Sequence, residues 1–294
     1  MSSSTKQVYK RAWALCNECM TLLGFHKITL DSLPLKAYTI LLLLSFLHWK
    51  GLAPSTITTY LSAIGYMHKA LNVVNPTTNF LVQKVLSSIN KIHGSSDSRL
   101  PITRFILHRL IDSVSIVVSN LYNSKLLKAM FLIAFYVLFR VGEITVQKSG
   151  EISLYLDQIQ IFKDRFILTI SKFKNNKLNR PFDIIIHKQG GEYCPYISLI
   201  DYLSCRGFSH GPVFRFIDGA PVSRSYFTTK LRNCISFCGL DPKRFKSHSF
   251  RIGSASYLAS LGKSDLQIKL LGRWNSDSFL RYIRNQKFDI FNHS

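Results

Sequence analysis

One stretch of the chain gathers side chains that can bind anions and transfer protons. His248-Ser249-Phe250-Arg251 holds an imidazole and a guanidinium three residues apart, a spacing that turns both to one face of a helix. Gly272-Arg273-Trp274 follows and Tyr282 comes next, so four polar or aromatic groups recur within thirty-five residues. Each feature alone is weak, because short motifs occur by chance and Trp or Tyr more often packs in a core. Together they indicate a functional site.

A further arginine ends the most apolar predicted helix. From about Ser124 to Thr145 the chain is apolar on almost every face until it reaches Arg140 and Glu143. A helix that is apolar all round is a core helix, and a buried charge is costly unless it is paired. Arg140 is therefore either one half of a buried ion pair with Glu143 or a cation directed into a functional cavity.

The net charge indicates what such a site would act on. The 294 residues include 38 Lys+Arg and 16 Asp+Glu, which gives a formal charge of +22. Residues 1–93 hold nine basic and two acidic residues, and Gly219–Lys263 holds eight basic residues and one acid. A cationic excess spread over both halves suits a protein that surrounds double-stranded nucleic acid. Ribosomal and membrane-surface proteins are the alternatives, but the chain lacks low-complexity basic runs and a strongly amphipathic basic helix.

Composition excludes other classes. With 47% hydrophobic residues the chain can bury a core, which excludes general disorder. The apolar runs Tyr38–Trp49 and Ala129–Phe139 fall short of the ~20 residues that cross a bilayer, so no integral membrane protein is expected. No secretory signal is visible, and we expect a reducing compartment. The pairs Cys16/Cys19 and Cys234/Cys238 favour reduced cysteines on helix faces over a zinc site, because no regular CxxC…CxxC spacing exists.

The elements that position these residues divide into two domains. Residues 1–93 carry four helical patterns, which predict a small bundle. The expected helices are Lys6–Leu23, a second from near Pro34 to before Gly51, a third from Pro54-Ser55-Thr56, and a fourth after Asn75-Pro76-Thr77-Thr78. The polar residues 94–99 predict a linker, and 100–294 form the second domain.

The second domain is predicted to hold two helices, a small antiparallel sheet and further helices. The strand-like runs are Ile152–Phe162, Arg165–Phe173 and Arg180–His187. Between the last two lies a polar tip, residues 174–179, which contains lysines. Helical signals return from Pro221, with Gly262 and Gly272 as stops and Ser264 and Ser276 as caps. The fold class is α+β and mostly helical.

Over nearly its whole length the chain resembles the tyrosine recombinase (phage integrase) family. The catalytic domain of that family has an arginine followed three residues later by an acid, a lysine at a β-hairpin, an HxxR, a His or Trp after a glycine, and then a tyrosine. Leu138–Ile144, the lysines of the polar tip, His248–Arg251, Gly272–Trp274 and Tyr282 match these in order. The tryptophan and the ending Tyr282-Ile283-Arg284-Asn285 are similar to Cre-like and eukaryotic Crypton-like mobile-element recombinases. Residues 1–93 look like the SAM-like helical bundle of the family's core-binding domain, which binds DNA.

The resemblance assigns a role to each site residue. Tyr282 would be the nucleophile that forms a 3′-phosphotyrosyl link, and the non-bridging phosphate oxygens would be bound by Arg140, Arg251, His248 and the Trp274 indole N–H. Glu143 would orient the arginine or the histidine and would not react itself. Lys174 would protonate the leaving 5′-oxygen, with Lys172 and Lys177 as alternatives. This chemistry needs neither a metal nor ATP, so no cofactor is expected.

The resemblance also implies partners and a function. The expected activity is site-specific DNA recombination or integration on double-stranded DNA, by a homo-oligomer that forms a tetrameric synapse and does not bind a membrane. Phe288, Ile290 and Phe291 could anchor neighbouring protomers. The compartment would be the nucleus in a eukaryote and otherwise the cytoplasm or nucleoid. The rivals are a domesticated DNA-binding relative that no longer cuts, disfavoured by the intact site residues, and a type IB topoisomerase, disfavoured by the helical N-terminal domain.

Overall fold

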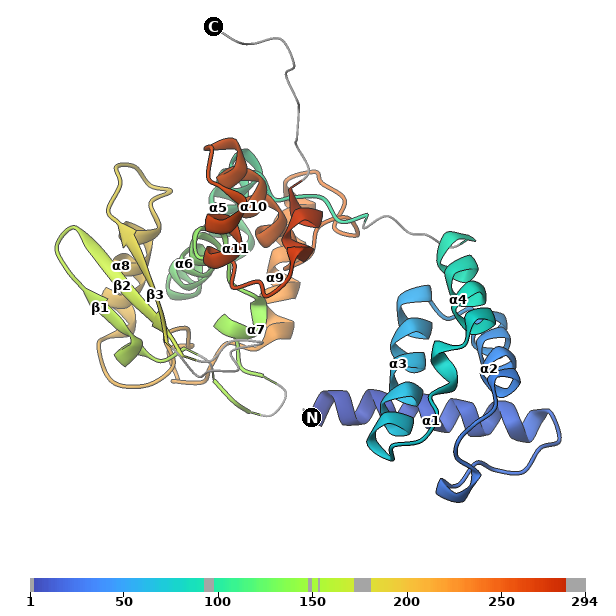
Figure 1. Cartoon of the computed structure of the whole chain (residues 1–294). Coiled ribbons are helices and arrows are strands. Elements are labelled where there is room, and N and C mark those ends of the chain that lie inside the picture. The colour runs from blue at the N-terminus through green and yellow to red at the C-terminus, as the bar shows by residue number, and fades with distance from the viewer. Residues whose placement is uncertain (1–2, 93–97, 148–149, 153, 172–180, 284–294) are drawn as a thin grey trace, which may run out of the picture. The chain divides into compact units, whose positions relative to one another are not determined.

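The fold is that of a computed structural model, which describes residues 3–92, 98–147, 150–152, 154–171 and 181–283 (Figure 1). The chain divides between Asp97 and Ser98 into two compact units, and each is described by itself. No helix in these ranges is long and apolar enough to span a membrane.

The first unit is the predicted bundle of four helices. They are α1 (Ser3–Leu22), α2 (Ala37–Trp49), α3 (Pro54–Ala70) and α4 (Phe80–Ile92), with short 3-10 turns at Leu30–Ser32 and Pro76–Thr78. Apolar residues of all four helices form one buried cluster, which includes Cys16, Leu44, Ile57 and Leu86. The predicted start of the second helix near Pro34 is wrong, because the chain stays extended at Lys36 and helical geometry begins at Ala37.

A buried histidine connects α3 to the segment that precedes α2. The His68 ring is fully buried, its Nε2 lies 3.0 Å from the Leu35 N–H and its Nδ1 lies 2.8 Å from the Ile64 carbonyl oxygen. Because the Leu35 N–H donates, Nε2 accepts, so the ring proton belongs on Nδ1 and is donated to Ile64. The side chain therefore ties the Leu35 backbone to α3.

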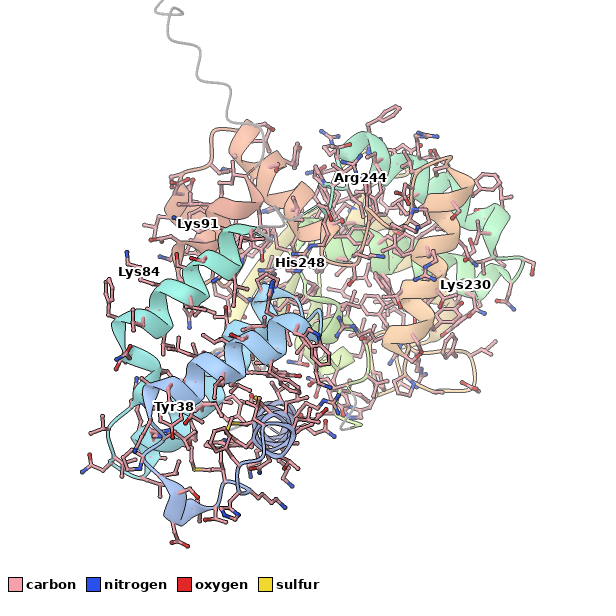
Figure 2. The ribbon with its side chains drawn as sticks, turned by 90° about the vertical axis from the view of Figure 1, so that its right-hand side faces the viewer. Tyr38, Lys84, Lys91, Lys230, Arg244 and His248 are labelled. Carbon is pink, nitrogen blue, oxygen red and sulfur yellow. The ribbon has the colours of Figure 1, made fainter. Side chains whose placement is uncertain are left out.

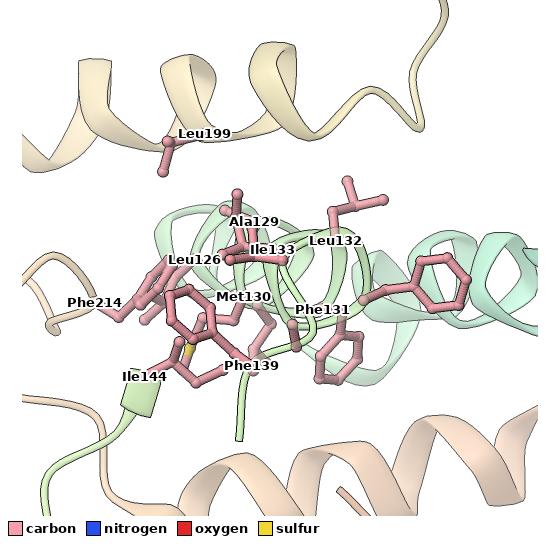
Figure 3. Packing of buried hydrophobic residues seen from close by; sticks show 14 of the residues in the cluster. Leu126, Ala129, Met130, Phe131, Leu132, Ile133, Phe139, Ile144, Leu199 and Phe214 are labelled. Atoms are coloured by element: carbon pink, nitrogen blue, oxygen red, sulfur yellow. The ribbon is translucent and has the colours of Figure 1, made fainter. Parts of the chain in front are cut away.

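The second unit builds its core around α6. Its helices are α5 (Arg104–Val117), α6 (Leu121–Tyr136), α7 (Val141–Ile144), α8 (Pro195–Arg206), α9 (Arg224–Phe237), α10 (Ser249–Ser260) and α11 (Asp265–Leu271), followed by the 3-10 helix η4 (Asp277–Tyr282). Helix α6 is buried on nearly all sides, as its apolar sequence predicts, and packs against α5, α8 and α10 (Figure 3). Leu199 of α8 and Ile144 of α7 belong to the same cluster.

The expected single helix from Ser124 to Thr145 is wrong. Helix α6 ends at Tyr136, and a separate one-turn helix, α7, starts at Val141. Between them Leu138 adopts a left-handed backbone conformation with φ +52°, which no continuous helix allows. The break leaves Arg140 at the N-terminus of α7 instead of inside a long helix.

The sheet is antiparallel, as predicted, and its strand order is β1-β2-β3. Its strands are β1 (Ile159–Ile161), β2 (Arg165–Ile170) and β3 (Phe182–His187), and Phe166 pairs with Ile186. The expected first strand is too long, because Leu156–Gln158 forms a 3-10 turn that Gln158 closes with its side chain on the Tyr155 N–H. Helix α8 follows β3 in a stretch for which no element was predicted.

Candidate active site

Helix α10 carries the histidine and the arginine of the HxxR motif. His248 is the N-cap residue, and Arg251 lies in the first turn with no exposed surface. The helix is held tightly against the start of the unit, because the Ile102 N–H donates to the Ser249 carbonyl oxygen at 3.0 Å. A Cβ on Gly253 would collide with the Ile102 backbone, so only glycine fits at this contact.

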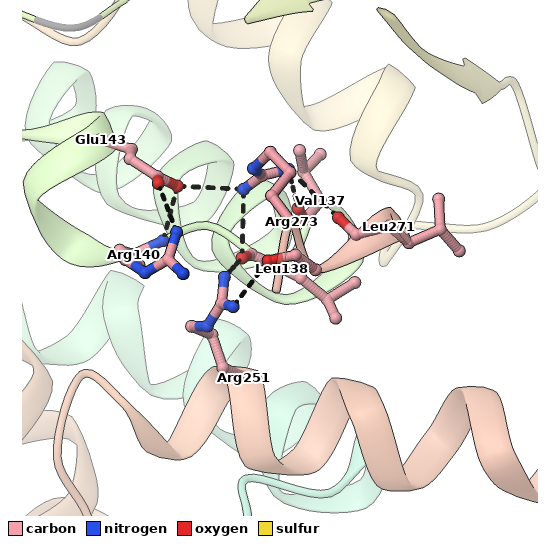
Figure 4. Close-up of polar contacts among 8 residues, drawn as sticks. Val137, Leu138, Arg140, Glu143, Arg251, Leu271 and Arg273 are labelled. Atoms are coloured by element: carbon pink, nitrogen blue, oxygen red, sulfur yellow. Dashed lines mark hydrogen bonds and ion pairs between the residues drawn. The ribbon is translucent and has the colours of Figure 1, made fainter. Parts of the chain in front are cut away.

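The Arg251 guanidinium lies deep in the site. Its Nη1 donates to the Leu138 carbonyl oxygen and its Nη2 to the Gly272 carbonyl oxygen at 2.8 Å (Figure 4). The Trp274 ring covers the guanidinium at 4.3 Å from its centroid. Burial lowers the pKa of Arg251 to about 9, and repulsion from Arg140 adds to this. An anion next to this group would therefore be stabilised.

Tyr282 ends η4 and is joined to His248. Its hydroxyl lies 2.7 Å from His248 Nε2, and the two ring centroids are 4.9 Å apart. The Ser256 hydroxyl of α10 donates to the Tyr282 carbonyl oxygen at 2.8 Å. Trp274 lies on another side, 5.6 Å from the Tyr282 ring. Three elements thus hold the phenol beside the imidazole and near Arg251.

Arg140 and Glu143 form an ion pair, which one of the two sequence interpretations required. Glu143 Oε1 accepts from Arg140 Nη1 at 3.0 Å, and Oε2 accepts from the Arg140 backbone N–H at 2.9 Å. The Glu143 side chain is only 6% exposed, whereas that of Arg140 is 23% exposed. The two sequence interpretations are therefore not exclusive, since Arg140 is paired and also partly open.

A cationic cleft of about 530 Å³ opens beside these groups. Arg140 and His248 line it together with further basic residues from α9 and the neighbouring segments, and no lining residue is acidic within the described part of the chain. The additional basic residues are Arg99, Arg224, Arg232 and Lys246. Figure 2 labels His248 together with Arg244 and Lys230, two further basic residues of the same unit. The cleft is built to hold an anion.

The structure brings together six of the residues named from the sequence: Arg140, Glu143, His248, Arg251, Trp274 and Tyr282. Lys174 and its alternatives Lys172 and Lys177 lie outside the described residues. The four paired cysteines lie on or at the end of helices and are buried and unbonded to each other. In the described ranges no group of three or more His, Cys, Asp or Glu could hold a metal ion.

Sequence reasoning missed Arg273 and the carbonyl group of Leu138. Arg273 Nη2 donates to Glu143 Oε2 at 3.0 Å and to the Leu138 carbonyl oxygen at 3.3 Å. The residue was visible in Gly272-Arg273-Trp274, but a charged residue between a helix end and a tryptophan carries no sign of burial. The Leu138 carbonyl has no sequence signal, since only the backbone turn at this residue directs it inward.

No family sequence model and no curated protein matches the chain in sequence. Solved structures do match in fold. The Tn1549 transposon integrase (residues 82–397) with transposon right-end DNA has a TM-score of 0.66 at 13% identity, over 98% of this chain and 91% of that one. The lambda integrase (residues 75–356) dimer on a COC′ core site has a TM-score of 0.61 at 14% identity, over 98% and 92%. The XerH site-specific recombinase on a palindromic difH substrate has a TM-score of 0.61 at 15% identity, over 85% and 69%.

These matches define the class of the fold. The chain has the tyrosine recombinase fold, a helical N-terminal unit followed by a mostly helical α+β unit with a small antiparallel sheet. At these low identities the likeness concerns the fold alone, so the activity has to be argued from the site.

Proposed function

We propose that this protein is a site-specific DNA recombinase that cuts and rejoins DNA strands through Tyr282. The observation that carries the proposal is the hydrogen-bond contact of 2.7 Å between the Tyr282 hydroxyl and His248 Nε2 beside a buried arginine. A phenol is a weak nucleophile at neutral pH unless a nearby base accepts its proton. A base within hydrogen-bond distance meets the geometric requirement for that role.

The proposed step is a transesterification in which bonds and protons balance. The Tyr282 oxygen attacks phosphorus and its proton passes to His248, so a P–O bond to tyrosine forms. The bond from phosphorus to the 5′-oxygen breaks, and that oxygen takes a proton from a lysine of the polar tip, with Lys174 the first candidate. One phosphodiester replaces another, so rejoining needs no external energy source. Metal and ATP independence is part of this proposal.

The surrounding charges fit an anionic transition state. Arg140, Arg251 and Arg273 place three guanidiniums around the single carboxylate of Glu143. An excess of positive charge at a poorly hydrated site costs free energy in the free protein. This cost is offset when the phosphate, with the negative charge it gains in the transition state, occupies the site. We assign Arg140 and Arg251 to the phosphate oxygens and keep Trp274 as a further donor, as predicted from the sequence. His248 was predicted as a donor to the same oxygens, and we propose it instead as the base that accepts the Tyr282 proton.

The cationic cleft would hold the DNA backbone next to the reacting phosphate. Phosphates are bound by Lys and Arg largely without regard to sequence, which positions the duplex. In the first unit, Lys84 and Lys91 lie exposed on α4 (Figure 2). We propose that this unit also binds duplex DNA, and that protomers assemble on it as a tetrameric synapse.

A trapping assay tests the proposal. Nicked duplexes tiled across the DNA that flanks the gene would be incubated with the protein and with Tyr282→Phe. We expect an adduct that survives denaturation, forms in the presence of EDTA and is absent with the variant. Salt-sensitive binding to all duplexes without any adduct would instead favour the DNA-binding relative that does not cut. Relaxation of supercoiled plasmid without exchange of partners would favour the topoisomerase.

A further inference from the structure

Arg273 lies at the centre of the site, and the proposed reaction gives it no contact with the phosphate and no proton to transfer. Its side chain is 1% exposed, and it is not among the residues that line the cleft. Its Nη1 donates to the carbonyl oxygens of Val137 and Leu271, at 3.3 and 3.2 Å, and its Nη2 to Leu138 and Glu143 (Figure 4). The guanidinium also lies 5.2 Å from the centroid of the Phe139 ring. The side chain thus joins α11 to the α6–α7 turn.

Glu143 connects Arg273 to Arg140, the partly exposed arginine that lines the cleft. Its carboxylate accepts from Arg140 on Oε1 and from Arg273 on Oε2, both at 3.0 Å. Were Arg273 neutral, one buried carboxylate would face Arg140 alone and cancel most of its charge. With Arg273 present, the three groups carry a net positive charge, and only Arg140 is partly exposed to direct it outward.

The backbone gives a second, independent observation. Arg273 and Leu138 both adopt left-handed conformations, with φ +54° and +52°. Such conformations cost roughly 1–3 kcal/mol each for non-glycine residues and persist only where the surroundings enforce them. The two residues meet at the Leu138 carbonyl oxygen, which accepts from both Arg273 and Arg251. A glycine would suit position 273 better by conformation alone, so the arginine side chain is what the position requires.

We infer that Arg273 is a positioning residue that offsets the charge of Glu143 and thereby keeps Arg140 positive toward the scissile phosphate. It also shares the Leu138 carbonyl oxygen with the Arg251 guanidinium, a contact that is secondary to the charge. The inference rests on the proposed function. It adds to that proposal a buried guanidinium that acts through Glu143 and Arg140 and makes no contact with the DNA.

The test measures the rate of covalent adduct formation at saturating DNA, with the nicked duplex that the wild type cleaves. We expect Arg273→Met to slow this step by about tenfold or more while DNA affinity changes little. Arg273→Lys keeps the charge near Glu143 and loses most of the carbonyl contacts, and it should recover most of the rate. This second variant also decides the question if Arg273→Met fails to fold.

Two further variants separate charge from structure. In Arg273→Met/Glu143→Gln the unmatched carboxylate is gone, so the adduct should form several-fold faster than with Arg273→Met alone. The matched control is Arg206→Met, since Arg206 of α8 is also buried and bonded to the carbonyls of Pro212, Gly207 and Ser209. It should lower the melting temperature and leave the adduct rate of the folded protein unchanged.

The outcomes are distinguishable. A wild-type adduct together with an Arg273→Met rate equal to wild type would overturn the inference and leave the proposed function intact. A double variant slower than Arg273→Met, or no recovery by Arg273→Lys, would also overturn it, because a purely structural arginine predicts that result. No wild-type adduct on any duplex would overturn the proposed function and the inference with it.

Discussion

At the scale of single residues, the proposed chemistry depends on how Tyr282 and His248 share a proton. The phenol has its nearest described polar side-chain partner in the His248 imidazole. We predict that His248→Ala slows adduct formation by about 10² to 10⁴, the usual contribution of a positioned base. Single-turnover trapping checks this. If the adduct instead formed within a few-fold of the wild-type rate, a group other than His248 would be the base that accepts the Tyr282 proton.

Arg251 allows a test of binding against chemistry. Arg251 is buried and bonded inside the unit. Its removal would therefore take a cation from the proposed phosphate site and leave the cations of the exposed surface in place. Arg251→Ala should abolish the covalent complex while most DNA affinity remains, as measured by gel shift and trapping on the same duplex. Equal loss of both, with a collapse of the melting temperature, would mean that Arg251 only holds the fold.

The general acid can be identified by changing the leaving group. An oxygen leaving group needs a proton, whereas a 5′-bridging sulfur leaves readily as a thiolate. We therefore expect Lys174→Ala to cleave an ordinary duplex about 10²-fold or more slowly than the wild type does. The same variant should cleave a 5′-phosphorothiolate duplex at the wild-type rate. Lys172→Ala and Lys177→Ala are the matched controls. Sulfur rescue of one of them instead of Lys174→Ala would transfer the role to that lysine.

At the scale of elements, the placement of α10 decides whether the site forms. Gly253 lies against the Ile102 backbone, which cannot move aside as a flexible side chain can. Gly253→Ala should lower the free energy of unfolding by about 3 kcal/mol. Gly190→Ala is the control, because open space surrounds Gly190. Denaturant unfolding of the two variants measures the difference, and equal midpoints would show that α10 packs less closely than described.

Periodicity predicted most elements and failed where the backbone turns inside the core. The four helices of the first unit and the antiparallel sheet follow from caps, prolines and alternating residues. The α6–α7 break could not be predicted, because Val137–Phe139 are buried whether the helix continues or turns. Helix α8 was missed although it could have been predicted, because Tyr196, Leu199 and Leu203 recur at helical spacing after Pro195.

The candidate site was predictable wherever a residue type limits the chemistry. An arginine with an acid three residues later, an HxxR, a tryptophan and a tyrosine stand in order along the chain, and the fold brings these six residues together. Arg273 was not predictable, because its importance comes from long-range contacts with Val137, Leu138 and Glu143 across more than 100 residues. Such contacts leave no local pattern.

At the scale of the whole molecule, we expect the net charge of +22 to dominate the proposed binding of DNA. Neutralising many phosphates releases counterions, so affinity for non-specific duplex should fall by about 10³ or more between 50 and 200 mM salt. Arg232→Ala, in the cleft, should reduce the slope of log affinity against log salt by about one. Lys125→Ala should leave the slope unchanged, because Lys125 is paired with Asp201 and lies outside the cleft lining. A flat salt response would contradict the binding of duplex DNA by these cations.

The most direct test of the central claim is to identify the protein atom that carries the DNA. A trapped adduct would be digested with protease and nuclease, and the nucleotide-bearing peptide sequenced by mass spectrometry, with the ends of the released strand analysed in parallel. The account predicts a nucleotide joined through its 3′-phosphate to Tyr282 and a released strand with a free 5′-hydroxyl. A nucleotide on another residue, a 5′-phosphate link, or cleavage without any protein–DNA bond would contradict it.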